Sequence, residues 1–233
     1  MASVTETASA TSGVDGTSHT FSALSIGSDG GNDVIIIQAG TRTVSNAQSA
    51  TVTVDGVSAN AQVQHFWNEA GSINTLAGIF TIERNSLPDP SQTDVDVVIT
   101  YDASVLRFGL ALGVSADASA TANATATNDA SGGNLNVNTV ANAIVCAVAF
   151  QGDSDTLTWT GLTEATDTTI ETGTFGTAYA SNVSAETPRS VDVAPDVTSD
   201  LSASVIAVFP VAGNAVGDGL TSGILLNRPR LAA

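Results

Sequence analysis

The stretch SATVTVDGVSANAQV, residues 49–63, indicates how this chain folds. It has Asp55-Gly56 at its centre, and apolar and polar residues alternate on both sides. Asp-Gly is typical of a type I′ turn, because both central positions need a positive φ that Gly adopts freely and Asp tolerates. A turn there predicts five facing pairs: Val54 with Val57, Val52 with Ala59, Ala50 with Ala61, Thr53 with Ser58 and Thr51 with Asn60. One face is then apolar and the other polar, which predicts a hairpin lying on a core.

Most of the sequence between residues 20 and 210 has the same character of strand and turn. Alternating apolar residues in 95–101 and 106–112 predict two strands, with a turn at 102–104. The run 143–150 is apolar at every position, which predicts a central strand covered on both faces. At most one helical turn is expected, in the region 69–79. We therefore predict an all-β protein, an antiparallel β-sandwich of jelly-roll type with about ten strands.

The composition divides the chain into three parts. Residues 1–19 are small and polar, which predicts a flexible N-terminal arm. We expect residues 20–210 to form the β-sandwich domain and residues 211–233 to form a C-terminal tail. Within the domain, residues 115–133 are also small and polar. They fit either a loop at the rim of one sandwich or a break between two lobes.

The charge of the chain is strongly one-sided. There are 23 acidic residues, six arginines and no lysine, which gives a net charge of −17. Such a surface repels phosphate backbones and anionic lipid surfaces, so we expect neither nucleic acid nor a membrane as a partner. The first residues lack a basic segment followed by an apolar one, so no signal peptide is expected.

Motifs for catalysis or metal binding are not found in the sequence. It has no G-x-S-x-G, H-E-x-x-H or P-loop pattern, and without lysine no Schiff base can form. His65 lies beside Phe66 and Trp67, where a structural role is expected. Cys146 lies in an apolar run and predicts a small buried side chain. We expect no enzyme activity, no cofactor and no metal.

Two weaker patterns leave other functions open. Three acid pairs have the spacing that a glycosidase or a calcium site uses: Asp94/Asp96, Asp153/Asp155 and Asp29/Asp33. Four aromatic residues are candidates for a sugar-stacking platform: Phe66, Trp67, Trp159 and Tyr179. The simpler interpretation is that the acids lie in solvated turns and that Trp159, which alternates with Leu157, fills the core.

The order of several segments resembles a known family. FSALSIGSDGGNDVIIIQAGT precedes ATVTVDGVSANAQVQ, then DVDVVITYDASVLRFGLALGVS, and later FQGDSDTLTWTGLTEATDTTIETGTFGTAYASNVSAE. This series is similar to the β-sandwich structural proteins of tailed bacteriophages and extends over residues 20–210. The resemblance implies a virion protein: a capsid decoration (cement) protein, a head fibre or a tail component. It implies no catalytic residues.

From these observations we expect a capsid decoration protein that stabilises a phage head by binding between capsid subunits. Its partners would be the major capsid protein and other copies of itself in a homotrimer. Candidate contact residues are Arg228 and Arg230 in the tail and His19 in the arm. The expected location is the virion, after assembly in the host bacterial cytoplasm. The alternative is a carbohydrate-binding module or a fibre component for host attachment.

Overall fold

The computed structural model describes residues 3–28, 33–43, 47–69, 73–128, 133–152, 156–195 and 202–212. These residues are nearly all in antiparallel β-strands, and their one helical element is a single 3-10 turn, η1 (Arg84–Ser86). No helix in this part of the chain is long and apolar enough to cross a membrane. The predicted all-β fold class is confirmed.

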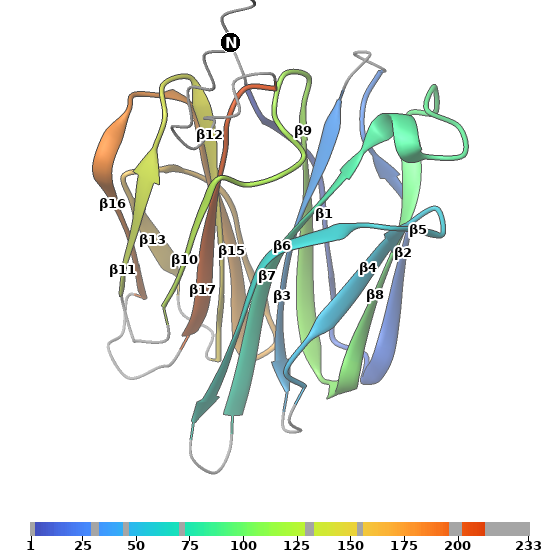
Figure 1. The fold of residues 1–233 in the computed structure, drawn as a ribbon. Helices are drawn as coiled ribbons and strands as arrows, with labels where there is room; N and C mark the ends of the chain where they lie inside the picture. Colours follow the sequence, from blue (N-terminus) through green and yellow to red (C-terminus); the bar gives the residue numbers. More distant parts are fainter. Residues whose placement is uncertain are drawn as a thin grey trace, which may run out of the picture.

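The first half of the chain forms a two-layered sandwich, here called sandwich 1 (Figure 1). Its inner sheet has the order β1-β9-β3-β7-β6, and its outer sheet has the order β2-β8-β4-β5. The strands are β1 (Thr5–Ser12), β2 (Gly16–Ser25), β3 (Val34–Thr43), β4 (Ala50–Val54), β5 (Val57–Ser58), β6 (Asn60–Glu69), β7 (Ile73–Glu83), β8 (Asp94–Val105) and β9 (Arg107–Ser115).

The second half forms sandwich 2, which lies beside the first (Figure 1). Its inner sheet has the order β10-β17-β12-β15-β14, and its outer sheet has the order β11-β16-β13. The strands are β10 (Ala124–Asn128), β11 (Gly133–Thr139), β12 (Ala143–Gln151), β13 (Leu157–Thr160), β14 (Thr163–Ile170), β15 (Gly173–Val183), β16 (Glu186–Pro195) and β17 (Ser202–Phe209).

The two sandwiches have the same topology. When the main strands of each half are numbered one to eight along the chain, leaving out the two-residue β5, both inner sheets read 1-8-3-6-5 and both outer sheets read 2-7-4. Chain segments that alternate in this way between two facing sheets form a jelly roll. The expected jelly-roll character is thus present twice, and residues 20–210 hold parts of two sandwiches instead of one.

Three apolar layers hold the four sheets together. One lies inside sandwich 1, one lies between the two inner sheets, and one lies inside sandwich 2. In β3, Ile35 and Ile37 face the first layer, whereas Val34 and Ile36 face the middle one. In β12, Val145 and Cys146 divide in the same way between the third layer and the middle one. Both strands are therefore buried on both faces, which explains their nearly continuous apolar sequences.

The middle layer depends on a notch in the inner sheet of sandwich 1. Gly40 of β3 and Gly109 of β9 face each other across the strand pair, and so do Phe150 of β12 and Phe175 of β15 in the opposite sheet. A Cβ atom added to Gly109 would overlap the side chain of Phe175, and one added to Gly40 would lie 2.9 Å from Cβ of Phe150. The two glycines are required because the aromatic side chains occupy the space of their missing side chains.

The sandwiches are related by an approximate two-fold rotation. Across the middle layer β6 contacts β10 and β17, β1 contacts β14, and β3 packs on β12, so the strand order is reversed. Gln38 Nε2 donates a hydrogen bond to Ala147 O (2.6 Å), and two residues further on Gly40 meets Phe150. The strands β3 and β12 therefore run in the same direction, and the axis lies along them. Equivalent loops of the two jelly rolls consequently lie at the same end of the molecule.

The segment 49–63 folds partly as predicted. Asp55 and Gly56 both have positive φ, at 49° and 81°. The two pairs nearest the turn form as predicted: Thr53 with Ser58 and Val54 with Val57. After Ala59 the chain leaves the outer sheet and enters the inner sheet as β6, because β7 offers a partner of eleven residues whereas β4 has only five. Two predicted pairs are therefore wrong: Ala50 with Ala61 and Thr51 with Asn60.

Two local expectations need correction. The strand β8 continues through residues 102–104 to Val105, so the turn to β9 lies later than predicted. A hydrogen bond from Leu106 N to Arg42 O (3.0 Å) connects this turn to β3. The helical turn expected in 69–79 is also wrong where the structure describes the chain, because 73–79 belong to β7. The single helical turn follows that strand.

The N-terminal segment differs most from expectation. We predicted a flexible arm over residues 1–19, but residues 5–12 form β1 and residues 16–19 begin β2. The strand β1 pairs with β9 from Thr5 to Ser12, because β9 would otherwise be an uncovered edge of the inner sheet. Nearly all of the segment 211–233, the predicted tail, lies outside the described residues.

The small polar segment 115–133 contains a break between two lobes, one of the two alternatives left open by its sequence, and its residues 124–128 form β10. Residues 116–123 lead from β9 of sandwich 1 to β10 of sandwich 2. Thr81 Oγ1 donates to Ala120 O (2.6 Å), and Ala122 N donates to Gln62 Oε1 (2.8 Å). These bonds hold residues 116–123, here called the crossing segment, against β6 and β7.

Replacing Gly109 by Ala tests the notch. We expect Gly109→Ala to lower the free energy of unfolding by about 1–3 kcal/mol, because the new Cβ overpacks against Phe175. Urea unfolding followed by far-UV circular dichroism measures the change.

The control is a double-mutant cycle with Phe175→Leu, which shortens the opposing side chain. The double variant should lose less stability than the sum of the two single variants. Equal unfolding midpoints for Gly109→Ala and the parent chain would contradict the notch.

Candidate functional site

His19 is a packed residue of β2. Only 8% of its surface is exposed, its ring centroid lies 3.8 Å from that of Phe108, and its Nε2 lies 3.1 Å from Gly16 O. Burial lowers the pKa of the imidazole below its ordinary value, and the contact with Gly16 O opposes part of that shift. The expectation that His19 lies in a mobile arm is therefore wrong. Little of its ring is left for contact with another subunit.

The predicted aromatic platform is not assembled. Trp159 and Tyr179 are each 8% exposed, and they face two different apolar layers of the molecule. Trp67 packs against the middle layer from β6, while its neighbour Phe66 is half-buried. The core interpretation of Trp159 is confirmed.

The three described members of the acid pairs have separate surroundings: Asp33, Asp94 and Asp96. Asp96 Oδ1 accepts a hydrogen bond from Ala23 N (2.9 Å), while Asp94 lies at the exposed start of β8. Asp33 is buried and forms an ion pair with Arg84. Three further acids of the predicted pairs lie outside the described residues: Asp29, Asp153 and Asp155.

Other reactive groups are also placed in structural positions. Cys146 is fully buried, as predicted, and burial raises the pKa of its thiol far above the ordinary value. His65 lies on β6, opposite Ala77. Among the residues that the structure describes, no three His, Cys, Asp or Glu side chains lie together as a metal site requires.

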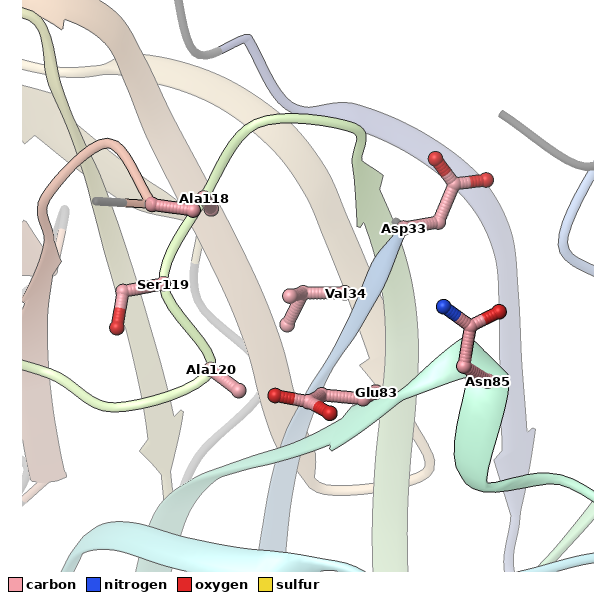
Figure 2. Close-up of a pocket in the computed structure, with 8 residues that line it drawn as sticks. Asp33, Val34, Glu83, Asn85, Ala118, Ser119 and Ala120 are labelled. Atoms are coloured by element: carbon pink, nitrogen blue, oxygen red, sulfur yellow. The ribbon is translucent and has the colours of Figure 1, made fainter. Parts of the chain in front are cut away.

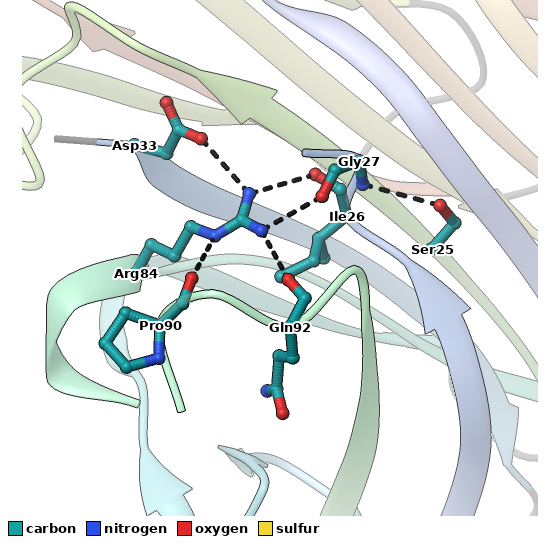
Figure 3. Close-up of polar contacts among 7 residues, drawn as sticks. All are labelled: Ser25, Ile26, Gly27, Asp33, Arg84, Pro90 and Gln92. Atoms are coloured by element: carbon teal, nitrogen blue, oxygen red, sulfur yellow. Dashed lines mark hydrogen bonds and ion pairs between the residues drawn. The ribbon is translucent and has the colours of Figure 1, made fainter. Parts of the chain in front are cut away.

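The most elaborate polar site is centred on Arg84, which the sequence did not single out (Figure 3). Its side chain is fully buried, although an arginine is rarely buried without partners. Its Nε and Nη atoms donate to five acceptors: Pro90 O (2.8 Å), Ile26 O (3.4 Å), Asp33 Oδ2 (3.2 Å), Gly27 O (2.9 Å) and Gln92 O. Four of these are backbone carbonyls, so the guanidinium closes two loops over one end of sandwich 1.

A pocket of about 310 Å³ lies beside this site, at the junction of the two sandwiches (Figure 2). Its lining comprises Asp33, Val34, Glu83, Asn85, Ala118, Ser119, Ala120 and Ala212. One wall is the crossing segment and the other is formed by β3 and the end of β7. Of the two carboxyl groups in this lining, Asp33 is paired with Arg84 and Glu83 is exposed.

A second pocket, of about 330 Å³, lies where β1 meets sandwich 2. It is lined by Val4, Thr163, Glu164, Ala165, Tyr179, Ala180 and Ser181. Burial, together with the nearby Asp167, raises the pKa of Glu164. Burial also holds the pKa of the Tyr179 phenol well above its ordinary value, and Cys146 and Glu6 add to this shift. Tyr179 therefore acts as a hydrogen-bond donor here.

The four arginines in the described ranges form their contacts within the molecule. Arg42 donates to Thr172, and Arg107 pairs with Glu171, so both connect sandwich 1 to the β14–β15 turn. Arg189 pairs with Glu186 (2.8 Å) and donates to Gly161 O (2.7 Å). Arg84 is buried as well. Because all four described arginines are engaged in this way, acidic side chains supply most of the charge on the exterior. The predicted contact residues Arg228 and Arg230 lie outside these ranges.

Comparison of the chain with protein-family models, with curated proteins and with solved structures finds no significant match.

Removal of the Arg84 side chain measures how much this polar site contributes to the stability of the protein. We expect Arg84→Met to cost about 3–5 kcal/mol of unfolding free energy, because it leaves the buried Asp33 carboxylate and several carbonyls without their donor. Urea denaturation gives the value.

The matched control for this change is Arg189→Met. That arginine and its partner Glu186 are both partly exposed, so its removal should cost less than about 1 kcal/mol. Similar losses for both variants would show that Arg84 has no special role.

The lowered pKa of His19 makes the stability of the protein depend on pH. A pKa lowered in the folded state means that the unfolded chain binds the proton more tightly, so stability is fully present at neutral pH and declines as pH falls below the ordinary imidazole pKa. Thermal unfolding from about pH 7.5 down to about pH 5.5, the range in which an imidazole titrates, should show a decline that is smaller in His19→Gln. An identical decline in both chains would refute this assignment.

Proposed function

We propose that this protein is a structural component of a virus particle, a capsid decoration protein that binds between subunits of the major capsid protein. The observation that carries the proposal is the pair of jelly rolls joined face to face. Jelly rolls occur in viral capsid proteins, lectins and cupins, where the rigid double sheet presents loops and faces to partners. The similarity of several segments to tailed-phage structural proteins supports the same assignment.

The outer faces of the molecule suit broad contact with a protein surface. On the outer face of sandwich 1 lie short polar side chains: Ser18, Thr20, Thr51, Thr53 and Thr100. On sandwich 2 the corresponding positions include Asn134, Asn136, Thr158, Thr160 and Ser190. Short side chains lose little rotamer entropy when they are ordered at an interface. Such faces favour binding by shape and hydrogen bonding.

The charge of the protein indicates the chemistry of its partner. The net charge of −17 and the internal use of the described arginines favour a basic surface on the capsid. Many copies on a symmetric shell add avidity, so each contact can be weak. The homotrimer, and the contacts of Arg228 and Arg230, remain predictions of this proposal.

Carbohydrate binding is the weaker alternative. It was expected to use stacked aromatics, but Trp159 and Tyr179 are buried in separate layers. Among the described residues, the single large apolar side chain that is exposed is Val14. Stacking on a sugar ring requires an exposed aromatic face, so the structure favours the shell role.

The proposal predicts that the protein is part of the finished particle. Particles purified by density gradient should contain it in a fixed ratio to the major capsid protein, as measured by quantitative mass spectrometry. A cryo-electron microscopy reconstruction should show four stacked β-layers per copy on the outside of the shell.

A binding experiment sharpens this test. Purified protein added to particles that lack it should co-sediment until all sites are filled, and the bound amount should fall at high salt because screening weakens charge pairing. Serum albumin, which is also acidic, is the control for non-specific attachment. Absence from purified particles, combined with no saturable binding, would exclude the shell role.

A further inference from the structure

We propose that β1 is an exchangeable strand, which pairs with β9 of its own chain or, in an assembly, with β9 of a second copy of this chain. The inference goes beyond the shell role and does not depend on it. It rests on how β1 is held, on what its removal would expose and on how it is connected.

The site that holds β1 has the features of a strand-addition site. The strand pairs antiparallel with β9 along its length, with one register shift between Glu6 and Ala8. In such sites main-chain hydrogen bonds give the affinity, and pockets for individual side chains give the specificity. Without β1, the strand β9 would be a free edge in the centre of the molecule, ready to accept the same segment from elsewhere.

Specific side chains of β1 and its neighbouring residues match sandwich 2. Glu6 accepts hydrogen bonds from three hydroxyl groups of the facing sheet: Thr166, Thr177 (3.0 Å) and Tyr179 (3.3 Å). Val4 N donates to Ser181 Oγ (3.1 Å). The Val4 side chain occupies the space beside Gly113, where an added Cβ would lie 2.8 Å from it. The site is therefore complementary to this segment, whichever copy supplies it.

Little apolar burial holds the strand in place. None of its residues is fully buried, and only Ala8 and Ala10 pack against the first apolar layer. Alanine side chains contribute little burial energy, so detaching the strand costs mainly hydrogen bonds that an identical site can restore. The equivalent strand β10 is also rich in small residues, but it lies in mid-chain and is connected at both ends.

The connection to β2 provides a hinge. The connecting residues 13–15 and the first residue of β2 have the sequence Gly-Val-Asp-Gly, and the Val14 side chain is 70% exposed. Opening such a link lets an N-terminal strand reach a neighbouring copy at low cost, because the strand then makes in the neighbour the same interactions that it makes in its own chain. Two opened hinges brought together can also cover Val14, which stabilises the exchanged form by burial that the closed form lacks.

Cysteine trapping tests the exchange directly. Ser9 of β1 faces Ala111 of β9, so cysteines at these two positions can form a disulfide only when the strand is in place. Full-length Ser9→Cys and Ala111→Cys chains, carrying different affinity tags, are expressed together and oxidised. We expect a disulfide-linked pair containing both tags, whereas neither variant expressed alone should give a comparable dimer.

A hinge variant gives an independent measurement. Deleting Val14 and Asp15 shortens the link so that β1 cannot fold back, and we expect the protein to shift to a dimer or larger species in size-exclusion chromatography with light scattering. Replacing the same two residues by Gly-Gly keeps the length and should leave the closed form favoured.

The outcomes are distinct. The inference is overturned if the Ser9→Cys/Ala111→Cys double variant forms its disulfide within one chain while the mixed single variants give no linked pair at the same concentration. If the deletion prevents folding, as judged by far-UV circular dichroism, the trapping result alone decides. Exchange without attachment to particles would support this inference and contradict the shell role, so the two can fail separately.

Discussion

The fold depends on the contact between two glycines and two phenylalanines at the centre of the molecule. Gly40 and Gly109 leave a notch in one inner sheet, and Phe150 and Phe175 fill it from the other. Protein interiors tolerate neither voids nor overlap, so this fit determines how closely the two inner sheets approach. Because both inner sheets are thereby buried on both faces, each jelly roll becomes part of one four-layered body.

This packing determines where polar groups can act. The approximate two-fold axis along β3 and β12 places equivalent loops at the same end of the molecule and leaves the two outer sheets facing solvent. The described arginines stabilise the interior and the junction, as Arg84 does at the loops and Arg107 does at Glu171. The surface that remains is rich in short polar side chains, and the chain as a whole is strongly acidic.

Much of the fold could be predicted from local sequence, whereas the polar sites could not. The alternation of apolar and polar residues identified β8, which is buried on one face. The continuous apolar run identified β12, which is buried on both faces. The duplication was missed, although TVTVDGVS (51–58) and TLTWTGLT (156–163) occupy equivalent strands and turns. The role of Arg84 was invisible, because four of its five acceptors are backbone carbonyls, which carry no residue-specific signal.

The sequence by itself determined the β class, the turn at Asp55-Gly56, the burial of Cys146 and the acidic character of the protein, since these follow from local pattern and composition. The tertiary structure alone decided that there are two sandwiches, that they pack through their inner sheets and that residues 5–12 form a strand. These features depend on partners about a hundred residues away along the chain, such as β9 for β1. A segment of small polar residues carries too little apolar surface to indicate such a partner. Residues 5–12 form a strand because the edge of β9 is there to pair with them.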